Sequence, residues 1–294
     1  MNITIYITIY ILILVLVLVY VVNFRDRKGF MERDIIDTNY INKFNRKDKI
    51  ARGIGGGDIL DYYYNNIREL DKTEKKRVSQ LFDIINEKIK QNNKYKKWLE
   101  IYFKVYRFDK LENNFPHTHH NNILIPDIFR LDNTYSILNT LLHEKIHILQ
   151  RFKKDMFYDL YENYWGFKKI KINKLEEIEK HSRTNPDGVN NNWVFSRDNT
   201  RIVLLSIYNK NSSSLSDVYT VGVYLDSNYN IIVPIKKRKI GEIREFTSFF
   251  GNLNGNNYHP NEISAEMLAG YLLDRNTKNI PAYRALDRWW KHIE

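Results

Sequence analysis

The pattern of hydrophobic and polar positions changes several times along the chain, and each pattern predicts a different kind of segment. Residues 73–90 and 136–150 carry apolar residues three or four positions apart, which is the spacing of an amphipathic helix. In residues 98–108 aromatic and β-branched residues roughly alternate with polar ones, which predicts a strand. Residues 281–293 return to the helical spacing and predict a terminal helix that docks on the core.

Residues 185–251 differ from their surroundings. Short runs rich in β-branched and aromatic residues occupy residues 193–195, 201–208, 218–224 and 231–235, and turns rich in Asn, Ser, Asp and Gly separate them. Runs of this kind, bounded by turn residues, predict strands that pair with their neighbours in an antiparallel sheet. The sequence therefore predicts an α+β fold with a β-rich insertion over residues 185–251.

Residues 3–22 form a continuous apolar run without a charge. Their length is close to the about 20 residues that a helix needs to cross a bilayer, so the run predicts a transmembrane helix. A removed signal peptide is the alternative, but no basic start and no small-residue cleavage site accompany the run. Arg25, Arg27 and Lys28 follow it and favour a cytoplasmic location for the rest of the chain.

The predicted domain organisation follows from this anchor. Residues 1–24 form the anchor, residues 25–70 a juxtamembrane linker, and residues 71–294 one folded domain. A glycine-rich stretch at residues 53–58 fits a hinge or tight turn within the linker, since it lacks the strand, the helix and the Lys-Ser/Thr pair of a phosphate-binding loop.

The helix predicted near residue 140 contains the sequence His143-Glu144-Lys145-Ile146-His147, which is an HExxH motif. Two histidines four residues apart lie on one face of a helix, so both rings can reach one metal ion. Glu144 falls beside them and suits a base that takes a proton from metal-bound water. Lys145 lies near the apolar side and would have to direct its amine outward. A buried helix with two incidental histidines is the alternative.

A second candidate helix begins near Pro260 and carries Glu262 and Glu266 on one face. Ala265 and Ala269 lie beside these carboxylates, and side chains this small would let the helix approach the HExxH helix closely. A carboxylate could then reach the metal as a third ligand. A solvated pair of carboxylates on a surface helix is the alternative.

With these two segments the chain resembles the gluzincin metallopeptidases, in which a glutamate from a later helix completes the HExxH site. The form Glu262-x-x-Ala265-Glu266 is similar to the third-ligand segment of the anthrax lethal factor protease domain. The resemblance implies a zincin-like domain, a Zn²⁺ ion held by His143, His147 and Glu262, and a peptide or protein substrate. It also implies that Glu266 orients a histidine through its ring N–H, although the roles of the two glutamates could be exchanged.

Other residues near the motif are candidates for substrate contacts. Tyr258 or His259 could donate to the oxyanion that forms during peptide hydrolysis, or could pack in a turn and cap a helix. Residues 122–125 resemble in placement the edge strand that binds extended substrates in related zincins. His117, His119 and His120 lie close together and could form a second metal site, but no further ligand is evident beside them.

Composition narrows the function. The chain has 294 residues and a net charge of +11, but its Lys and Arg residues are interspersed with acidic ones and no nucleic-acid motif occurs, so we expect no nucleic-acid partner. The absence of cysteine excludes disulfides, zinc–thiolate sites and cysteine nucleophiles. An N-terminal anchor before an Asn-, Lys- and Tyr-rich HExxH domain also resembles metallopeptidase-like membrane proteins of large DNA viruses, which implies a virion-internal location as a variant of the cytoplasmic one.

The sequence thus predicts a membrane-anchored zinc metallopeptidase, an endopeptidase in which a zinc-activated water attacks the peptide bond with Glu144 as general base. The main alternative is a catalytically inactive, membrane-tethered binding or structural protein on a metallopeptidase-like fold. Binding of nucleic acid through the basic surface is a third possibility, which predicts an affinity that falls steeply with salt.

Overall fold

The computed structural model describes residues 35–127, 134–173, 175–187, 192–253, 255, 257–275 and 279–293. It divides into two units, Met1–Asp37 and Thr38–Glu294, and the second contains every element discussed below. The predicted membrane span at residues 3–22 and the basic residues after it lie outside the described residues. None of the helices in the described ranges combines the length and the apolar character that a membrane span needs.

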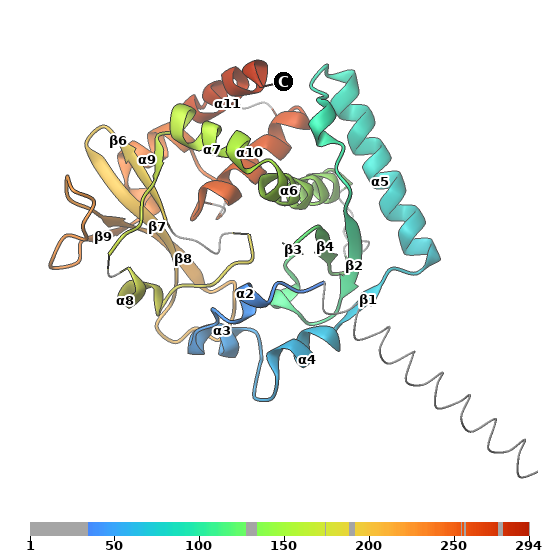
Figure 1. Ribbon diagram of the computed structural model, residues 1–294, viewed down its shortest axis with the longest axis horizontal. Helices are drawn as coiled ribbons and strands as arrows, with labels where there is room; N and C mark the ends of the chain where they lie inside the picture. Colours follow the sequence, from blue (N-terminus) through green and yellow to red (C-terminus); the bar gives the residue numbers. More distant parts are fainter. Residues whose placement is uncertain are drawn as a thin grey trace, which may run out of the picture. The chain divides into compact units, whose positions relative to one another are not determined.

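The second unit is an α+β structure with two sheets, as Figure 1 shows. Its helices are α2 (Thr38–Ile41), α3 (Arg46–Ala51), α4 (Ile59–Tyr64), α5 (Lys72–Gln91), α6 (Thr134–Phe152), α7 (Lys154–Asp159), α8 (Glu176–Glu179), α9 (Arg244–Phe250), α10 (Pro260–Leu272) and α11 (Pro281–His292). Short turns of other helix types occur at Lys97–Leu99, Glu112–Asn114, Leu160–Tyr164 and Ile240–Glu242. The predicted helix at residues 73–90 is therefore confirmed as α5, and Asp71 caps its N-terminus.

The first sheet has the strand order β1 (Ile67–Glu69), β2 (Lys104–Phe108), β4 (Asn122–Ile125), β3 (His117–His119). β2 and β4 run parallel, and the other two pairs are antiparallel. The prediction of an edge strand at residues 122–125 is wrong, because β4 pairs on both sides and all four of its residues are buried. Its neighbour β3 does not offer a free edge either, since Arg151 donates a hydrogen bond to the carbonyl of Thr118.

The second sheet is an antiparallel meander in the order β5 (Phe167–Lys169), β6 (Trp193–Arg197), β7 (Thr200–Tyr208), β8 (Val218–Tyr224), β9 (Lys237–Lys239). It confirms the first three predicted strands of the insertion. The fourth, at residues 231–235, is wrong: Ile231 makes only an isolated bridge to Leu225, and Val233 is 85% exposed. Pro234 lacks an N–H group and cannot donate to a strand ladder, which is consistent with pairing that resumes only at Lys237.

The core lies around α6, the helix that carries the HExxH motif. Its apolar side packs against α5, α10 and the strands β3 and β4. Leu141, Leu142 and Ile148 are fully buried there. Lys145 is also buried, with its amine 5.8 Å from the ring centre of Phe103, so the expectation that this amine reaches solvent is wrong. Burial lowers the pKa of Lys145 to about 8.

Residues 38–70, predicted as part of a linker, are folded into the same unit. Tyr40 and Tyr63 are fully buried, and both hydroxyls donate to Glu112. Arg52 connects α3 to Glu112 through Nε at 2.9 Å and to the carbonyl of Thr184 at 2.8 Å. Because these contacts are buried and bridge distant parts of the chain, the predicted boundary at residue 70 is wrong for residues 38–70.

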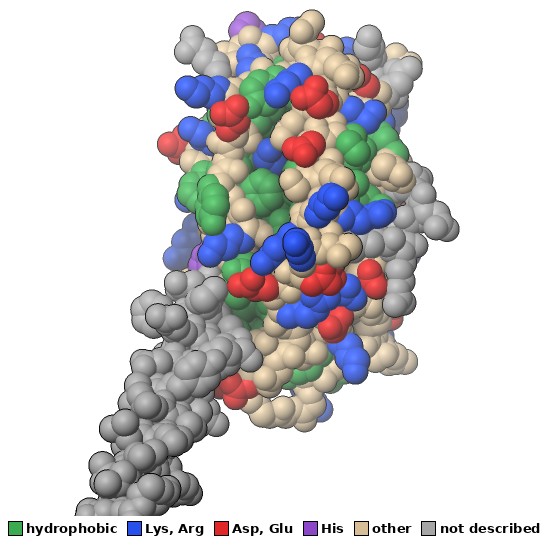
Figure 2. Space-filling view, turned by 90° about the vertical axis from the view of Figure 1, so that its right-hand side faces the viewer, with side chains coloured by type: hydrophobic (Ala, Val, Ile, Leu, Met, Phe, Trp, Pro, Cys, Tyr) green, Lys and Arg blue, Asp and Glu red, His purple; other side chains and the backbone are tan. Residues whose placement is uncertain are grey.

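The surface on the side of α5 is mixed in charge. Figure 2 shows Lys and Arg side chains interspersed with Asp and Glu on this face. The exposed side of α5 contributes both signs, among them Lys75, Lys76, Asp83 and Glu87. The absence of a nucleic-acid partner stays a prediction, since nothing here tests it.

Candidate metal centre

Helix α6 places the two histidines of the motif one turn apart on its polar side. The distance between His143 Nε2 and His147 Nε2 is 3.0 Å. Both side chains are largely buried, with 11% and 2% of their surface exposed. The opposite side of α6 packs in the apolar core, so the two rings point away from that core, toward α10.

Helix α10 brings the third group. Pro260 occupies its first turn, and Ala265 and Ala269 are fully buried where α10 lies against α6. Glu262 Oε2 lies 3.4 Å from His143 Nε2, and Oε1 lies 3.6 Å from His147 Nε2. His143, His147 and Glu262 each offer one ligand atom, and these atoms lie within 4.8 Å of one another, so the group could hold a metal ion.

The electrostatics of this group favour a cation. Burial by itself would raise the pKa of Glu262, but His147 and His143 hold the pKa of Glu262 well below its usual value. Burial would lower the pKa of His147, but Asp187 and Glu262 raise the pKa of His147 instead. Two carboxylates thus surround His147 in a buried place, and a bound metal ion would offset their negative charge.

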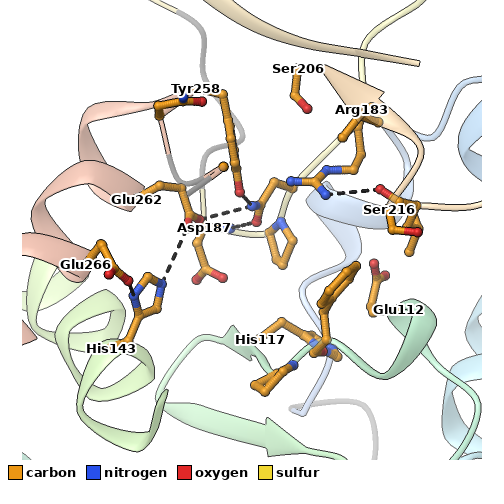
Figure 3. Close-up of a pocket in the computed structure, with 18 of the residues that line it drawn as sticks. Glu112, His117, His143, Arg183, Asp187, Ser206, Ser216, Tyr258, Glu262 and Glu266 are labelled. Carbon is orange, nitrogen blue, oxygen red and sulfur yellow. Dashed lines mark hydrogen bonds and ion pairs between the residues drawn. The ribbon is translucent and has the colours of Figure 1, made fainter. Parts of the chain in front are cut away.

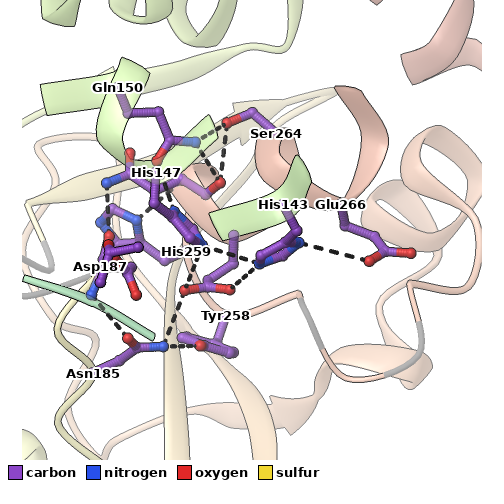
Figure 4. A network of polar contacts seen from close by, with 12 residues as sticks. His143, His147, Gln150, Asn185, Asp187, Tyr258, His259, Ser264 and Glu266 are labelled. Carbon is purple, nitrogen blue, oxygen red and sulfur yellow. Dashed lines mark hydrogen bonds and ion pairs between the residues drawn. The ribbon is translucent and has the colours of Figure 1, made fainter. Parts of the chain in front are cut away.

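A hydrogen-bond chain fixes the ring of His147, as Figure 4 shows. Nδ1 of His147 lies 2.9 Å from Oε1 of Gln150, an amide oxygen that can only accept, so Nδ1 carries a proton and Nε2 is the nitrogen left to bind a metal ion. Nε2 of Gln150 donates to the carbonyl of Asn261 and to Oγ of Ser264, both at 2.8 Å. The hydroxyl of Tyr161 continues the chain to Ser264. Residues of α10 therefore orient a histidine of α6.

Glu266 lies on the other side of the group. Its Oε2 is 3.8 Å from Nδ1 of His143, which is too long for a hydrogen bond, and its Oε1 accepts from Arg275 at 2.7 Å. Of the two glutamates whose roles the sequence left open, Glu262 is the one whose oxygens face Nε2 of both histidines.

Glu144 is buried beside the histidines and lines the cavity described below. Burial raises the pKa of Glu144, while His143 and His147 lower it by less. Its Oε2 has no hydrogen-bond partner among the described residues. Glu144, His147 and Asp187 form a second group of three possible ligand atoms, which shares His147 with the first.

These groups open onto a cavity of about 520 Å³ (Figure 3). Its lining comes from several elements: α6, α10, the strands β7 and β8, the turn before β3, and residues 183–187. Figure 3 shows His143, Glu262 and Glu266 on one side of it, with His117 and Glu112 facing them from the turn and strand region of the first sheet. A cavity of this size holds a ligand of a few residues.

The segment Asn185–Asp187 completes the site, and in the sequence only a turn-forming Asn-Pro-Asp marks it. Nδ2 of Asn185 donates to Glu262 Oε1 at 3.0 Å and contacts the hydroxyl of Tyr258. Asp187 accepts from Arg151 at 2.6 Å and from the hydroxyl of Thr118. Asn185 thus holds Glu262, and Asp187 ties the segment to α6 and to β3.

The two residues predicted to contact an oxyanion take different places. Tyr258 is buried and lines the cavity beside Asn185, which is compatible with a contact to substrate. His259 caps α10 instead: its Nδ1 accepts from the N–H of Asn261 at 3.1 Å, and it is not among the lining residues. The capping alternative stated for His259 is therefore confirmed, and the catalytic assignment of His259 is corrected.

The three histidines near β3 do not join one metal group in the described part of the chain. His117 and His119 are buried with ring centres 5.2 Å apart, and His120 is exposed. His119 packs against the rings of Tyr40 and Tyr63. Burial lowers the pKa of both buried histidines, which keeps them neutral.

Comparisons with protein-family models, with curated proteins and with solved structures found no match.

Proposed function

We propose that this protein is a zinc-dependent metallopeptidase of gluzincin type, anchored in a membrane by residues 3–22. One observation carries the proposal: two imidazole nitrogens from α6 and a carboxylate from α10 converge in a buried site that opens onto a cavity. The HExxH motif predicts His143 and His147 as ligands, and the resemblance to gluzincins implies Glu262.

The donor set fits zinc. Two imidazoles and one carboxylate are a recognised set for catalytic zinc, which keeps a further position open. Ligand atoms about 2.0–2.1 Å from a tetrahedral zinc ion lie about 3.3 Å from one another. The two Nε2 atoms here are 3.0 Å apart, His143 Nε2 is 3.4 Å from Oε2 of Glu262, and His147 Nε2 is 3.6 Å from Oε1 of the same carboxylate. A bound zinc ion would act as a Lewis acid and lower the pKa of water.

The side chains of the protein supply the remaining roles. Glu144 would remove a proton from the attacking water and pass it to the leaving amine, because its carboxylate faces the cavity next to both histidines and its Oε2 has no partner in the described residues. Gln150 holds the ring of His147. Tyr258, whose hydroxyl accepts from Asn185 at the cavity wall and so keeps its own proton, would donate to the carbonyl oxygen of a peptide.

Metal content and turnover test the proposal together. The full-length protein should bind about one zinc ion per chain, measured by elemental analysis after dialysis. It should also cleave an unstructured protein substrate such as casein. Glu144→Gln should keep the metal and lose cleavage, whereas His143→Ala should lose both. Glu87→Gln, on the exposed side of α5, is the matched control and should change neither.

Two results would contradict the proposal. If the protein binds no zinc, the proposal has no basis. A protein that binds zinc but cleaves nothing, and whose cellular role is unchanged in Glu144→Gln, would favour the inactive binding protein instead. Membrane attachment and a cytoplasmic or virion-internal location are separate proposals, and removal of residues 1–24 should release the protein from membranes on fractionation.

A further inference from the structure

Arg183 lines the cavity at the end away from His143 (Figure 3). One of its guanidinium nitrogens donates to the carbonyl of Leu215 at 3.2 Å, and the group lies 5.0 Å from the ring centre of Tyr258. Within the described ranges no carboxylate comes within ion-pair distance of it. A guanidinium has five N–H donors, so most of the donors of Arg183 are not used by these contacts.

The other arginine of the cavity lining, Arg52, has carboxylate partners. Arg52 pairs with Asp48 and with Glu112, each at 2.9 Å, and these two carboxylates more than offset its charge. The remaining charged residues of the lining are acidic and lie mainly around the metal group. Of the two arginines in the lining, Arg183 is therefore the one that has no direct carboxylate partner among the described residues.

The backbone around Arg183 is held as an added strand of the second sheet. Its N–H donates to the carbonyl of Ser206 in β7 at 2.7 Å, and Ser182 bridges Ile207. Ser206 in turn is paired with Thr220 of β8. Side chains that lie opposite one another in an antiparallel ladder point to the same face of the sheet. Arg183, Ser206 and Thr220 thus form one row on the sheet, and all three line the cavity.

Ser206 gives an independent sign of a ligand. It is only 4% exposed, and its hydroxyl has no hydrogen-bond partner in the described part of the chain. A buried hydroxyl without a partner is destabilising, so such groups normally have a hydrogen-bond partner. Figure 3 shows Ser206 and Arg183 on the same side of the cavity. A ligand anion on Arg183 would lie next to this hydroxyl.

We propose that Arg183, with Ser206 and Thr220 beside it, binds a carboxylate of the substrate. The inference rests on the proposed peptidase function and names its substrate class: a peptide with an acidic side chain near the scissile bond, or with its C-terminal carboxylate in the cavity. Arginine binds carboxylates through two parallel hydrogen bonds, which fixes orientation as well as affinity. The carboxylates around the metal group disfavour the reverse orientation, in which the carboxylate of the peptide would lie beside the metal group.

Equilibrium binding tests the inference without turnover. The probes are fluorescein-labelled hexaalanine peptides with an amidated C-terminus, in which one Glu or one Gln occupies each position in turn, plus hexaalanine with a free C-terminal carboxylate. They are titrated by fluorescence polarisation into the zinc-loaded full-length Glu144→Gln protein. We expect about 10–100-fold tighter binding for Glu than for Gln at one or two positions, or for the free acid over the amide. The first result identifies a side-chain carboxylate and the second a C-terminal one.

A second substitution assigns the preference to Arg183. Arg183→Gln should abolish the difference between the Glu and Gln peptides while leaving the neutral peptides bound as before, and Arg183→Lys should restore part of it. Arg238→Gln, on the exposed strand β9, is the control and should keep the full difference. Equal binding of the Glu and Gln peptides at every position, together with equal binding of the free acid and the amide, would overturn the inference. So would a loss of binding in Arg183→Gln that is the same for charged and neutral peptides, because Arg183 would then only support Tyr258.

The outcome is separable from that of the proposed function. The same peptides are incubated with the zinc-loaded parent protein, and cleavage is followed by mass spectrometry. Cleavage without any carboxylate preference contradicts the inference and leaves the peptidase proposal in place. A carboxylate preference that depends on Arg183, without cleavage of any peptide, supports the anion site and contradicts the peptidase proposal.

Discussion

Replacement of Gln150 by alanine should weaken metal binding without touching a metal ligand. The amide oxygen of Gln150 accepts from Nδ1 of His147 at 2.9 Å, and its amide nitrogen is held by Asn261 and Ser264 at 2.8 Å each. Without this acceptor the ring of His147 can turn or bind a proton on Nε2. Loss of a partner that orients a metal-binding histidine typically costs about 10–100-fold in metal affinity, which is about 1.4–2.8 kcal/mol.

The measurement is a competition for zinc between the protein and a chelating dye, at constant pH and ionic strength. Gln150→Ala should lower the affinity by the factor above. Ser264→Ala keeps the contact between Gln150 and His147, so its affinity should fall by less than about threefold. Gln91→Ala, at the exposed end of α5, serves as the control and should leave the affinity unchanged.

Stability must be measured separately, because Gln150 is buried and makes three hydrogen bonds. Each such bond contributes about 0.5–1.5 kcal/mol, so the metal-free Gln150→Ala protein should lose about 1–4 kcal/mol of unfolding free energy in urea. An affinity for zinc within twofold of the parent value, in a variant that is still folded, would refute the role assigned to the hydrogen-bond chain.

Two further predictions concern stability. Arg52→Met should lower the free energy of unfolding by about 3–5 kcal/mol in urea, because it leaves buried carboxylates without their cation, and adding Glu112→Gln should recover part of this loss; equal effects in single and double variants would contradict the coupling. The hydrogen bond from Arg68, with help from the backbone of Asp71 and from Arg107, lowers the pKa of Glu74 to about 2 although burial acts to raise it. This pKa lies below the unfolded value, so the stabilising contribution is present above about pH 4.5 and is lost as the pH falls toward 2. Because Arg68 is partly exposed, Glu74→Gln should cost only about 1–2 kcal/mol at pH 7 and almost nothing near pH 2, and a cost independent of pH would argue against the ion pair.

The candidate ligands His143 and His147 were predictable because their relation depends on local periodicity. A spacing of four on a helix fixes the relation of His143 to His147, whatever the rest of the chain does. Glu262 was harder to predict, because its position depends on the packing of two helices that more than a hundred residues separate in the sequence. Small residues at Ala265 and Ala269 gave the one local sign of close approach, and they are buried where α10 meets α6.

The rest of the site could not be predicted in this way. Asn185 and Asp187 lie in an irregular segment without periodicity, and their partners Glu262, Arg151 and Thr118 come from three other elements. Polar residues in such segments look the same in sequence whether they face solvent or a buried site. The assignment of residues 25–70 to a linker had the same origin, because α2 to α4 are too short to give a clear periodic signal.

The misassigned region bears on the site itself. Asp48 of α3 accepts from the N–H and the hydroxyl of Thr184, at 3.1 and 2.7 Å. Thr184 stands between Arg183, which lines the far end of the cavity, and Asn185, which donates to Glu262. The segment that contacts Glu262, the proposed third ligand, is therefore hydrogen-bonded to α3, which the sequence patterns assign to the linker. A fragment that begins at residue 71 would lack this support, and its candidate metal centre would lose the restraint on Glu262 even if α6 and α10 formed.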